Sequence, residues 1–86
     1  MYIIELSKRA QKQLNALPPL VQARLIPEID ILSTNPRPPG VKPLKGTTGL
    51  LRLRVGDYRV IYQVADEYLL VLVVEIGHRR EVYRAI

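Results

Sequence analysis

The apolar residues of this chain change their spacing once, from a helical period before residue 36 to a strand period after residue 50. The first half carries two stripes in which apolar residues recur every three or four positions: Ala10, Leu14 and Leu17, and then Val21, Leu25, Ile29 and Leu32. Such spacing predicts two amphipathic helices. The short apolar run Tyr2–Leu6 precedes them and predicts a strand.

Residues that start or stop helices mark the boundaries of the first half. Ser7 is expected to cap the first helix with its hydroxyl group. Pro18-Pro19 is expected to end that helix and begin the second, because proline suits the first turn. Pro27 lies inside the second stripe and removes the hydrogen bond to the carbonyl of Ala23, which predicts a kink or two short helices in series.

The second half predicts an antiparallel β-meander after a loop. Residues 36–49 are rich in proline and glycine and are expected to form an ordered loop that helps to hold a ligand. From residue 51, apolar residues alternate with arginines, so one face of the strand is apolar and the other basic. Gly56-Asp57 predicts a two-residue hairpin loop with a positive φ at the glycine, followed by a return strand, 58–64.

The end of the meander completes the predicted fold. Asp66-Glu67 is expected to form a second turn, and Tyr68–Ile76 is so evenly apolar that a central strand covered on both faces is expected. The sequence therefore predicts one α+β domain over residues 1–86: an N-terminal strand, a helical hairpin, and an antiparallel β-meander with the helices packed on one face.

Composition excludes several classes of function. The chain has no cysteine and one histidine, so thiolate chemistry and the usual zinc-ligand sets are not possible, and neither a metal nor a cofactor is expected. The longest apolar run, 69–74, is far shorter than the ~20 residues of a membrane-spanning helix. No signal-peptide pattern follows Met1. A cytoplasmic protein with no membrane partner is expected.

Positive charge is concentrated in the second half. The formal net charge is +5, and residues 37–86 contain nine basic and five acidic residues, a balance of 9 − 5 = +4. Arginine presents a planar fork of donors that matches phosphate, so this distribution favours a polyanionic partner. A solvated basic face that keeps the protein soluble is the alternative.

Arginines on two neighbouring predicted strands form the first candidate site. Arg52 and Arg54 should leave the same face about 6.6 Å apart, and Arg59 joins them if the apolar residues of both strands face the helices. Like charges opposite one another across a hairpin are destabilising unless an anion compensates. Surface salt bridges to Asp57, Asp66 or Glu75 are the structural alternative.

The segment after the last predicted strand forms the second candidate site. His78 is the one side chain that ordinarily titrates near neutral pH, and Tyr83 is a candidate proton donor or acceptor if Arg79 and Arg80 lie close to it. The alternative is that Tyr83 only packs against the last strand. Together the two clusters suit metal-independent RNA cleavage by the 2′-hydroxyl of the RNA, in which cations stabilise a charged phosphorane.

Four motifs give the chain a resemblance to the RelE/ParE toxin superfamily: Leu44-Lys45-Gly46, Leu51-Arg52-Leu53-Arg54, the segment 56–62 (GDYRVIY) and the segment 77–83 (GHRREVY). The resemblance implies a RelE-like toxin of a type II toxin–antitoxin system, an endoribonuclease that cleaves mRNA in the ribosomal A site. It also implies an acidic, RelB-like antitoxin from a neighbouring gene, and operator DNA as a partner of the toxin–antitoxin complex only.

The resemblance also implies roles for individual residues. Arg59 matches an arginine that stabilises the scissile phosphate, and Arg79 matches a second arginine at the phosphate. Tyr83 matches a tyrosine that stacks on or activates the nucleotide. Arg52 and Arg54 match strand cations, usually lysines, that contact RNA and support proton transfer. The remaining residues expected to bind RNA are Lys42, Lys45, His78 and Arg80.

The chain departs from the family pattern in two respects, and two other functions are alternatives to RNA cleavage. Arginine at positions 52 and 54 is a poor general base, which leaves Tyr83 ahead of His78 as the proton acceptor. The chain ends at Ile86, so inhibition by direct coverage of the basic face is expected. A ParE-like toxin that inhibits gyrase without nuclease activity is one alternative. A non-catalytic basic module that binds nucleic acid is the other.

Overall fold

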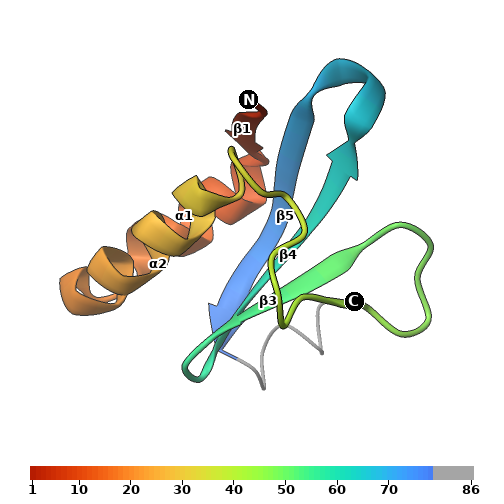
Figure 1. Cartoon of the computed structure of the whole chain (residues 1–86). Coiled ribbons are helices and arrows are strands. Elements are labelled where there is room, and N and C mark those ends of the chain that lie inside the picture. Colours follow the sequence, from red (N-terminus) through yellow and green to blue (C-terminus); the bar gives the residue numbers. More distant parts are fainter. Residues whose placement is uncertain (79–86) are drawn as a thin grey trace.

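The computed structural model describes residues 1–78 and places two helices on one side of a mostly antiparallel sheet (Figure 1). The elements are β1 (Ile3–Leu6), α1 (Lys8–Ala16), α2 (Pro19–Ile31), β2 (Lys42–Pro43), β3 (Leu51–Val55), β4 (Tyr58–Ala65), a short 3₁₀ turn (Asp66–Tyr68) and β5 (Leu70–His78). Neither helix in this part of the chain is long and apolar enough to cross a membrane.

The five strands form one sheet in the order β1-β5-β4-β3-β2. β1 pairs in parallel with β5, and every other neighbouring pair is antiparallel. The predicted α+β architecture is therefore confirmed. The parallel pairing places the N-terminal strand beside the first half of the last strand.

The main core lies between the helices and one face of the sheet. Both predicted helical stripes point into it, and the inward residues of β3 and β4 are the ones that the alternation predicts, among them Leu53, Val60 and Tyr62. Because these side chains face the helices, the arginines that alternate with them are left on the opposite face. We call this opposite face of the sheet the outer face.

The predicted helix boundaries are confirmed, with one correction. The Ser7 hydroxyl accepts a hydrogen bond from the Ala10 amide at 3.0 Å, and Pro19 opens α2. Of the two outcomes expected at Pro27, a kink or two short helices in series, the second is wrong, because Pro19–Ile31 is a single α-helix. Pro27 and Ala23 are both exposed, so water can satisfy the Ala23 carbonyl that the proline leaves without a donor.

Two predictions about the meander need correction. The segment 36–49 contains a short strand, β2, which was not predicted. Tyr68 belongs to the 3₁₀ turn, and β5 begins at Leu70 after Leu69, whose φ is 50°. The centre of the sheet is β4, and the described helices cover only one face of β5. Apolar residues on its outer face, such as Leu72, are half-buried.

A one-residue bulge in β5 sets which side chains face outward near its end. Tyr62 pairs with Val73 and Ile61 with Glu75, so Val74 is the extra residue. Beyond the bulge, Ile76 faces the core and Gly77 lies opposite Arg59. A ladder without the bulge would turn Ile76 outward beneath Arg59, because a one-residue slip exchanges the two faces of a strand.

Candidate nucleic-acid interface

Cations from three neighbouring strands meet on the outer face of the sheet. Arg54 on β3 lies directly opposite Arg59 on β4, and Arg52 on β3 lies directly opposite Lys42 on β2. We call Lys42, Arg52, Arg54 and Arg59 the basic face. The expected convergence of the three arginines is confirmed, and two like-charge pairs across strands result. Such pairs are destabilising in the free protein.

Arg59 is a buried cation with incomplete hydrogen bonding. The residue is 7% exposed, and within residues 1–78 its Nε has no hydrogen-bond partner. Its Nη1 makes a long contact of 3.5 Å with the carbonyl of Tyr58. Across β5 its neighbour is Gly77, which contributes no side chain. A buried donor without an acceptor costs about 1–3 kcal/mol, and an anion at this position would satisfy it.

Two of the three carboxylates proposed as salt-bridge partners for these arginines pair with other residues. Asp66 pairs with Arg37, and Glu75 pairs with Arg9 at 3.0 Å. Among residues 1–78, neither Arg54 nor Arg59 forms a salt bridge, and Arg54 Nε donates to the carbonyl of Gly56 at 3.1 Å. The structural alternative is therefore not what the structure shows for these two residues.

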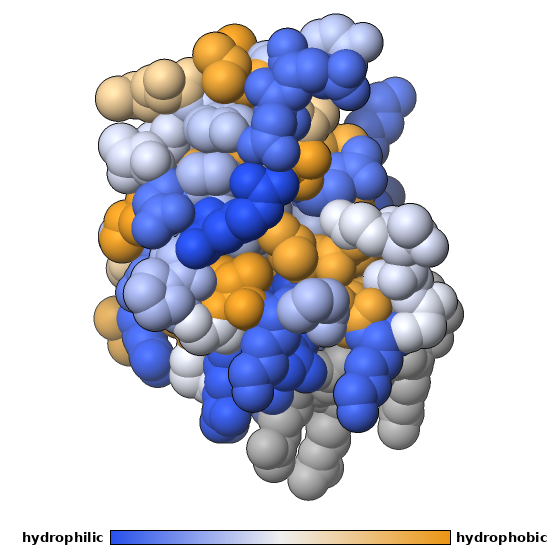
Figure 2. All heavy atoms as spheres, turned by 45° about the vertical axis from the view of Figure 1, so that its right-hand side comes forward, coloured by the Kyte–Doolittle hydropathy of each residue, from blue (hydrophilic) through white to orange (hydrophobic). Residues whose placement is uncertain are grey.

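The loop after β2 folds back over the outer face beside these cations. Leu44 and Leu50 pack on Ile61 and Val74, and the Leu44 amide donates to the Leu50 carbonyl at 2.9 Å. This small apolar cluster anchors the loop that carries Lys45. Figure 2 brings the β2–β3 loop forward and shows hydrophilic side chains around apolar ones on this side of the molecule.

A hollow of about 460 Å³ lies where the loop meets β3. It is lined by Lys42, Pro43, Leu44, Lys45 and Arg52, so three of its five lining residues are cations. The charge of this lining suits an anionic group. Lys42 and Lys45, which the sequence placed on a loop, therefore lie beside Arg52 because β2 and the apolar cluster fix the loop.

A network of polar contacts holds the start of this loop. The Tyr62 hydroxyl donates to the Pro36 carbonyl at 2.7 Å, and Arg37 donates to both oxygens of Asp66 at 3.1 and 2.9 Å. Tyr2 also donates to Asp66, at 2.6 Å. The Arg37 and Tyr2 hydrogen bonds lower the pKa of Asp66 to about 2, and burial raises the pKa of Tyr62 to about 12. Nothing in the sequence indicated the role of Arg37, because its partners are far away along the chain.

His78 lies on the other side of the sheet from Arg59. It pairs with Tyr58 across the strands, and the two rings meet edge to face with centroids 5.7 Å apart. Tyr58 packs against the core. The structure therefore brings Lys42, Lys45, Arg52, Arg54 and Arg59 together and places His78 apart from them.

The other expected site residues, Arg79, Arg80 and Tyr83, lie outside the described residues. Within residues 1–78, no cluster of three or more histidine or acidic side chains is suited to hold a metal ion. The described site offers hydrogen-bond donors and positive charge, which suit an anionic ligand.

Comparison with known proteins finds one family that the sequence of this chain matches. The family model described as the ParE toxin of the parDE type II toxin–antitoxin system matches residues 4–83. Toxin RelG of Mycobacterium tuberculosis is 32% identical over 85 residues, which are 96% of this chain and 97% of RelG. The chain belongs to the RelE/ParE superfamily of type II toxins. It is a RelE-like toxin of a type II toxin–antitoxin system.

Solved structures of RelE proteins share the fold of this RelE-like toxin. The intact Escherichia coli RelBE toxin–antitoxin complex contains a chain that superimposes with a TM-score of 0.80 at 26% identity, covering 91% of this chain and 96% of that one. The archaeal RelE–RelB complex from Pyrococcus horikoshii OT3 gives a TM-score of 0.78 at 34% identity, covering 91% and 94%. Both similar structures are complexes with an antitoxin.

Proposed function

We propose that this RelE-like toxin is an endoribonuclease that cleaves mRNA in the ribosomal A site without a metal ion. The observation that carries the proposal is Arg59, a buried cation whose Nε has no partner among residues 1–78 and which has a second cation, Arg54, opposite it. The scissile phosphate would supply the missing acceptor. Its negative charge would also offset the repulsion between the two arginines.

The reaction that suits these residues is attack by the RNA's own 2′-hydroxyl. The 2′-oxygen bonds to phosphorus, the bond to the 5′-oxygen breaks, and the products are a 2′,3′-cyclic phosphate and a 5′-hydroxyl. One proton leaves the 2′-oxygen and one reaches the 5′-oxygen. Arg59 and Arg54 would stabilise the phosphorane charge, since preorganised donors are most effective where charge develops.

The remaining residues take the roles that the family resemblance implies. Tyr83 is proposed as the proton acceptor, because arginine at 52 and 54 stays protonated. Arg79 is proposed as the second cation at the phosphate. Lys45, together with Lys42, Arg52 and Arg80, would position the flanking RNA. His78 is proposed to contribute least, since its ring rests on Tyr58.

The proposed partners and location follow from the same resemblance. An acidic, RelB-like antitoxin would inhibit the toxin, as the similar solved complexes suggest. The toxin would contact operator DNA only as part of that complex. Both the ribosome and mRNA are cytoplasmic, so the toxin would act there.

Expression of the toxin without antitoxin tests the proposal. We expect growth arrest and mRNA cut within codons on translating ribosomes, mapped by sequencing RNA ends. Arg59→Ala and Tyr83→Phe should each reduce cleavage by at least about 100-fold, while Arg59→Lys should recover only part of the loss because lysine lacks the fork. Lys12→Ala, an exposed cation on α1, is the matched control and should cleave normally.

A gyrase-inhibiting toxin is the second candidate, because the matching family model is that of ParE. Intact transcripts together with DNA-damage signalling would favour it and reject the nuclease proposal. Binding of RNA without scission would instead indicate the non-catalytic module. Full toxicity of both Arg59→Ala and Tyr83→Phe would show that the proposed site is wrong.

A further inference from the structure

The turn between β3 and β4 brings together two arginines from different elements. Arg54 lies near the end of β3, and its Nε donates to the carbonyl of Gly56 at 3.1 Å. Arg24 comes from α2, and its Nη2, Nη1 and Cζ atoms lie 3.0, 3.2 and 3.4 Å from the position that a Cβ atom on Gly56 would occupy. We call Arg24 and Arg54 the turn pair.

Gly56 is the residue that allows Arg24 to approach the turn so closely. Its φ is 61°, in the left-handed region that favours glycine, and it opens the two-residue turn. A Cβ atom at this position would lie 3.0 Å from Nη2 of Arg24, so the guanidinium group would have to move away. The glycine that the hairpin needs for its backbone thus also makes room for a cation from α2.

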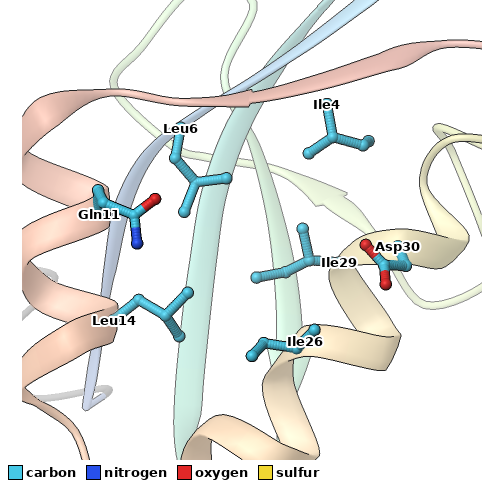
Figure 3. Close-up of a pocket in the computed structure, with 7 residues that line it drawn as sticks. All are labelled: Ile4, Leu6, Gln11, Leu14, Ile26, Ile29 and Asp30. Carbon is cyan, nitrogen blue, oxygen red and sulfur yellow. The ribbon is translucent and has the colours of Figure 1, made fainter.

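The position of Arg24 at the turn follows from the side of α2 on which it lies. Ile26 and Ile29 point toward side chains of β1 and α1 in the hollow between these elements (Figure 3). Arg24 does not line this hollow. Because successive helical residues are rotated by about 100°, Arg24 leaves α2 on the side opposite to Ile26, which is the side of the hairpin turn.

Neither arginine of the turn pair has a carboxylate partner within residues 1–78. In this part of the chain, Arg24 forms no ion pair and no hydrogen bond, and Arg54 forms no ion pair. Asp57, the second residue of the turn, forms no salt bridge with either of them. Both guanidinium groups contact Gly56, so they lie within about 10 Å of each other, which is about the Debye length at 0.1 M salt. Their charges therefore repel, and an anion bound by both would relieve the repulsion.

The turn pair continues the basic face toward α2. Arg59 lies directly opposite Arg54, so Arg54 links the buried arginine of the outer face to Arg24 at the turn. With Asp57 included, these four residues have a net charge of 3 − 1 = +2. A nucleic-acid strand carries a charge at every nucleotide and can therefore contact neighbouring cations in turn. This continuity favours RNA over an acidic protein as the ligand of the turn pair.

We propose that Arg24 and Arg54 form a second phosphate subsite, which binds the phosphodiester next to the scissile one in the RNA strand. The inference rests on the proposed function in taking the scissile phosphate to lie at Arg59. Arg24 would bind the neighbouring phosphate without touching the reacting atoms. Its removal is therefore expected to raise KM and to leave kcat almost unchanged.

Substitution of Arg24 in the full-length toxin tests the subsite. With mRNA on translating ribosomes, Arg24→Gln should raise KM about threefold to fivefold, the effect of one exposed ion pair, and change kcat less than about twofold. For a short single-stranded RNA, it should reduce the salt dependence of binding by about one phosphate contact, or about 0.7 in slope. Lys12→Gln is the matched control, an exposed cation on α1 away from the turn, and should change neither quantity. An unchanged KM and slope for Arg24→Gln would overturn the proposal.

Neutral linkages in the RNA locate the contact. A methylphosphonate replaces one charged phosphodiester at a time on either side of the cleavage point. At the linkage next to the scissile one, on one side, this replacement should raise KM for the unaltered toxin and leave KM for the Arg24→Gln toxin as it was, because that contact is already lost. Contacts between the mRNA and the ribosome affect both toxins equally and cancel in the comparison. Equal effects on the two toxins at every linkage would contradict the subsite.

The outcomes keep this proposal distinct from the nuclease proposal. Cleavage that does not depend on Arg24 would overturn the subsite and leave the nuclease intact. RNA binding that depends on Arg24, without cleavage, would reject the nuclease and retain the subsite. A loss of affinity for an acidic protein in the Arg24→Gln toxin, with RNA affinity unchanged, would assign the turn pair to that protein and overturn the proposal, as would failure of the unaltered toxin to bind RNA.

Discussion

Arg59 and Arg54 lie opposite each other on the outer face, and the Nε of the buried Arg59 has no acceptor in the described part of the chain. In the free protein, this arrangement lowers the free energy of unfolding through desolvation and repulsion. Functional sites often reduce the stability of the free protein in this way, and a bound ligand then completes the site. At the scale of the residue, a substitution that removes one of these charges is therefore expected to raise the free energy of unfolding and to reduce activity.

We predict that Arg59→Met abolishes mRNA cleavage and raises the free energy of unfolding by about 1–2 kcal/mol. Methionine keeps the length of the buried side chain and removes both the unpaired donor and the charge. Urea unfolding of the free toxin measures the change. Lys45→Met, at an exposed position, should alter stability by less than about 0.5 kcal/mol. A less stable Arg59→Met chain would mean that the guanidinium is well solvated in the native state.

Tyr62 gives a prediction for alkaline pH. Burial raises its pKa from 10.0 to about 12. The native state therefore keeps the phenol protonated at pH values where the unfolded chain loses its proton, so its contribution is complete below pH 10 and is lost as the pH rises toward 12. We predict that stability falls between pH 10 and 12 and that Tyr62→Phe flattens this fall. Equal pH dependence of the two chains, measured by urea unfolding, would contradict the assignment.

At the scale of the element, α1 completes the edge of β5 after β1 ends. The Ile76 amide donates to Gln13 Oε1 at 2.8 Å, and the Gln13 amide in turn donates to Glu75. The Ser7 hydroxyl donates to the Val74 carbonyl at 3.2 Å. These contacts lie at the bulge that places Gly77 opposite Arg59. The helix thus helps to hold the register on which the basic face depends.

We predict that Gln13→Ala lowers the free energy of unfolding by about 1–2 kcal/mol, because the Ile76 amide and the buried Glu75 carboxylate each lose a partner. The amides of Ile76 and Gly77 should exchange faster with solvent. Gln11→Ala is the matched control, since the Gln11 side chain is exposed and donates to Asn15 on its own helix. Similar losses for the two variants would argue against a role for Gln13 at the sheet edge.

At the scale of the whole molecule, positive charge gathers on one side of the sheet. The basic face and the loop that carries Lys45 lie on the outer face, and the two helices lie on the other side. Salt should weaken RNA binding in proportion to the number of phosphates that the basic face neutralises.

We predict that RNA affinity falls linearly with the logarithm of salt concentration, and that each phosphate contact contributes about 0.7 to the slope. Arg54→Gln should reduce the slope by about that amount. Lys12→Gln should leave it unchanged, since α1 lies away from the outer face. Fluorescence titration with a short single-stranded RNA measures both slopes. A lower slope for Lys12→Gln would show that RNA extends onto the helix side.

Local patterns in the sequence were enough to predict most of the fold. The spacing of apolar residues, the Ser7 cap, the paired prolines and the Gly56-Asp57 turn each act over a few neighbouring residues, so no tertiary information was needed. The alternation of β3 and β4 also placed Arg52, Arg54 and Arg59 on one face. Their family roles came from the motifs around them.

Features that depend on distant segments required the tertiary structure. The parallel pairing of β1 with β5, the bulge at Val74 and the contact of Arg37 with Asp66 join residues far apart in the chain. The burial of Arg59 depends on how separate elements pack. Side-chain periodicity reports which face a residue occupies, but pairing and packing decide what lies opposite it.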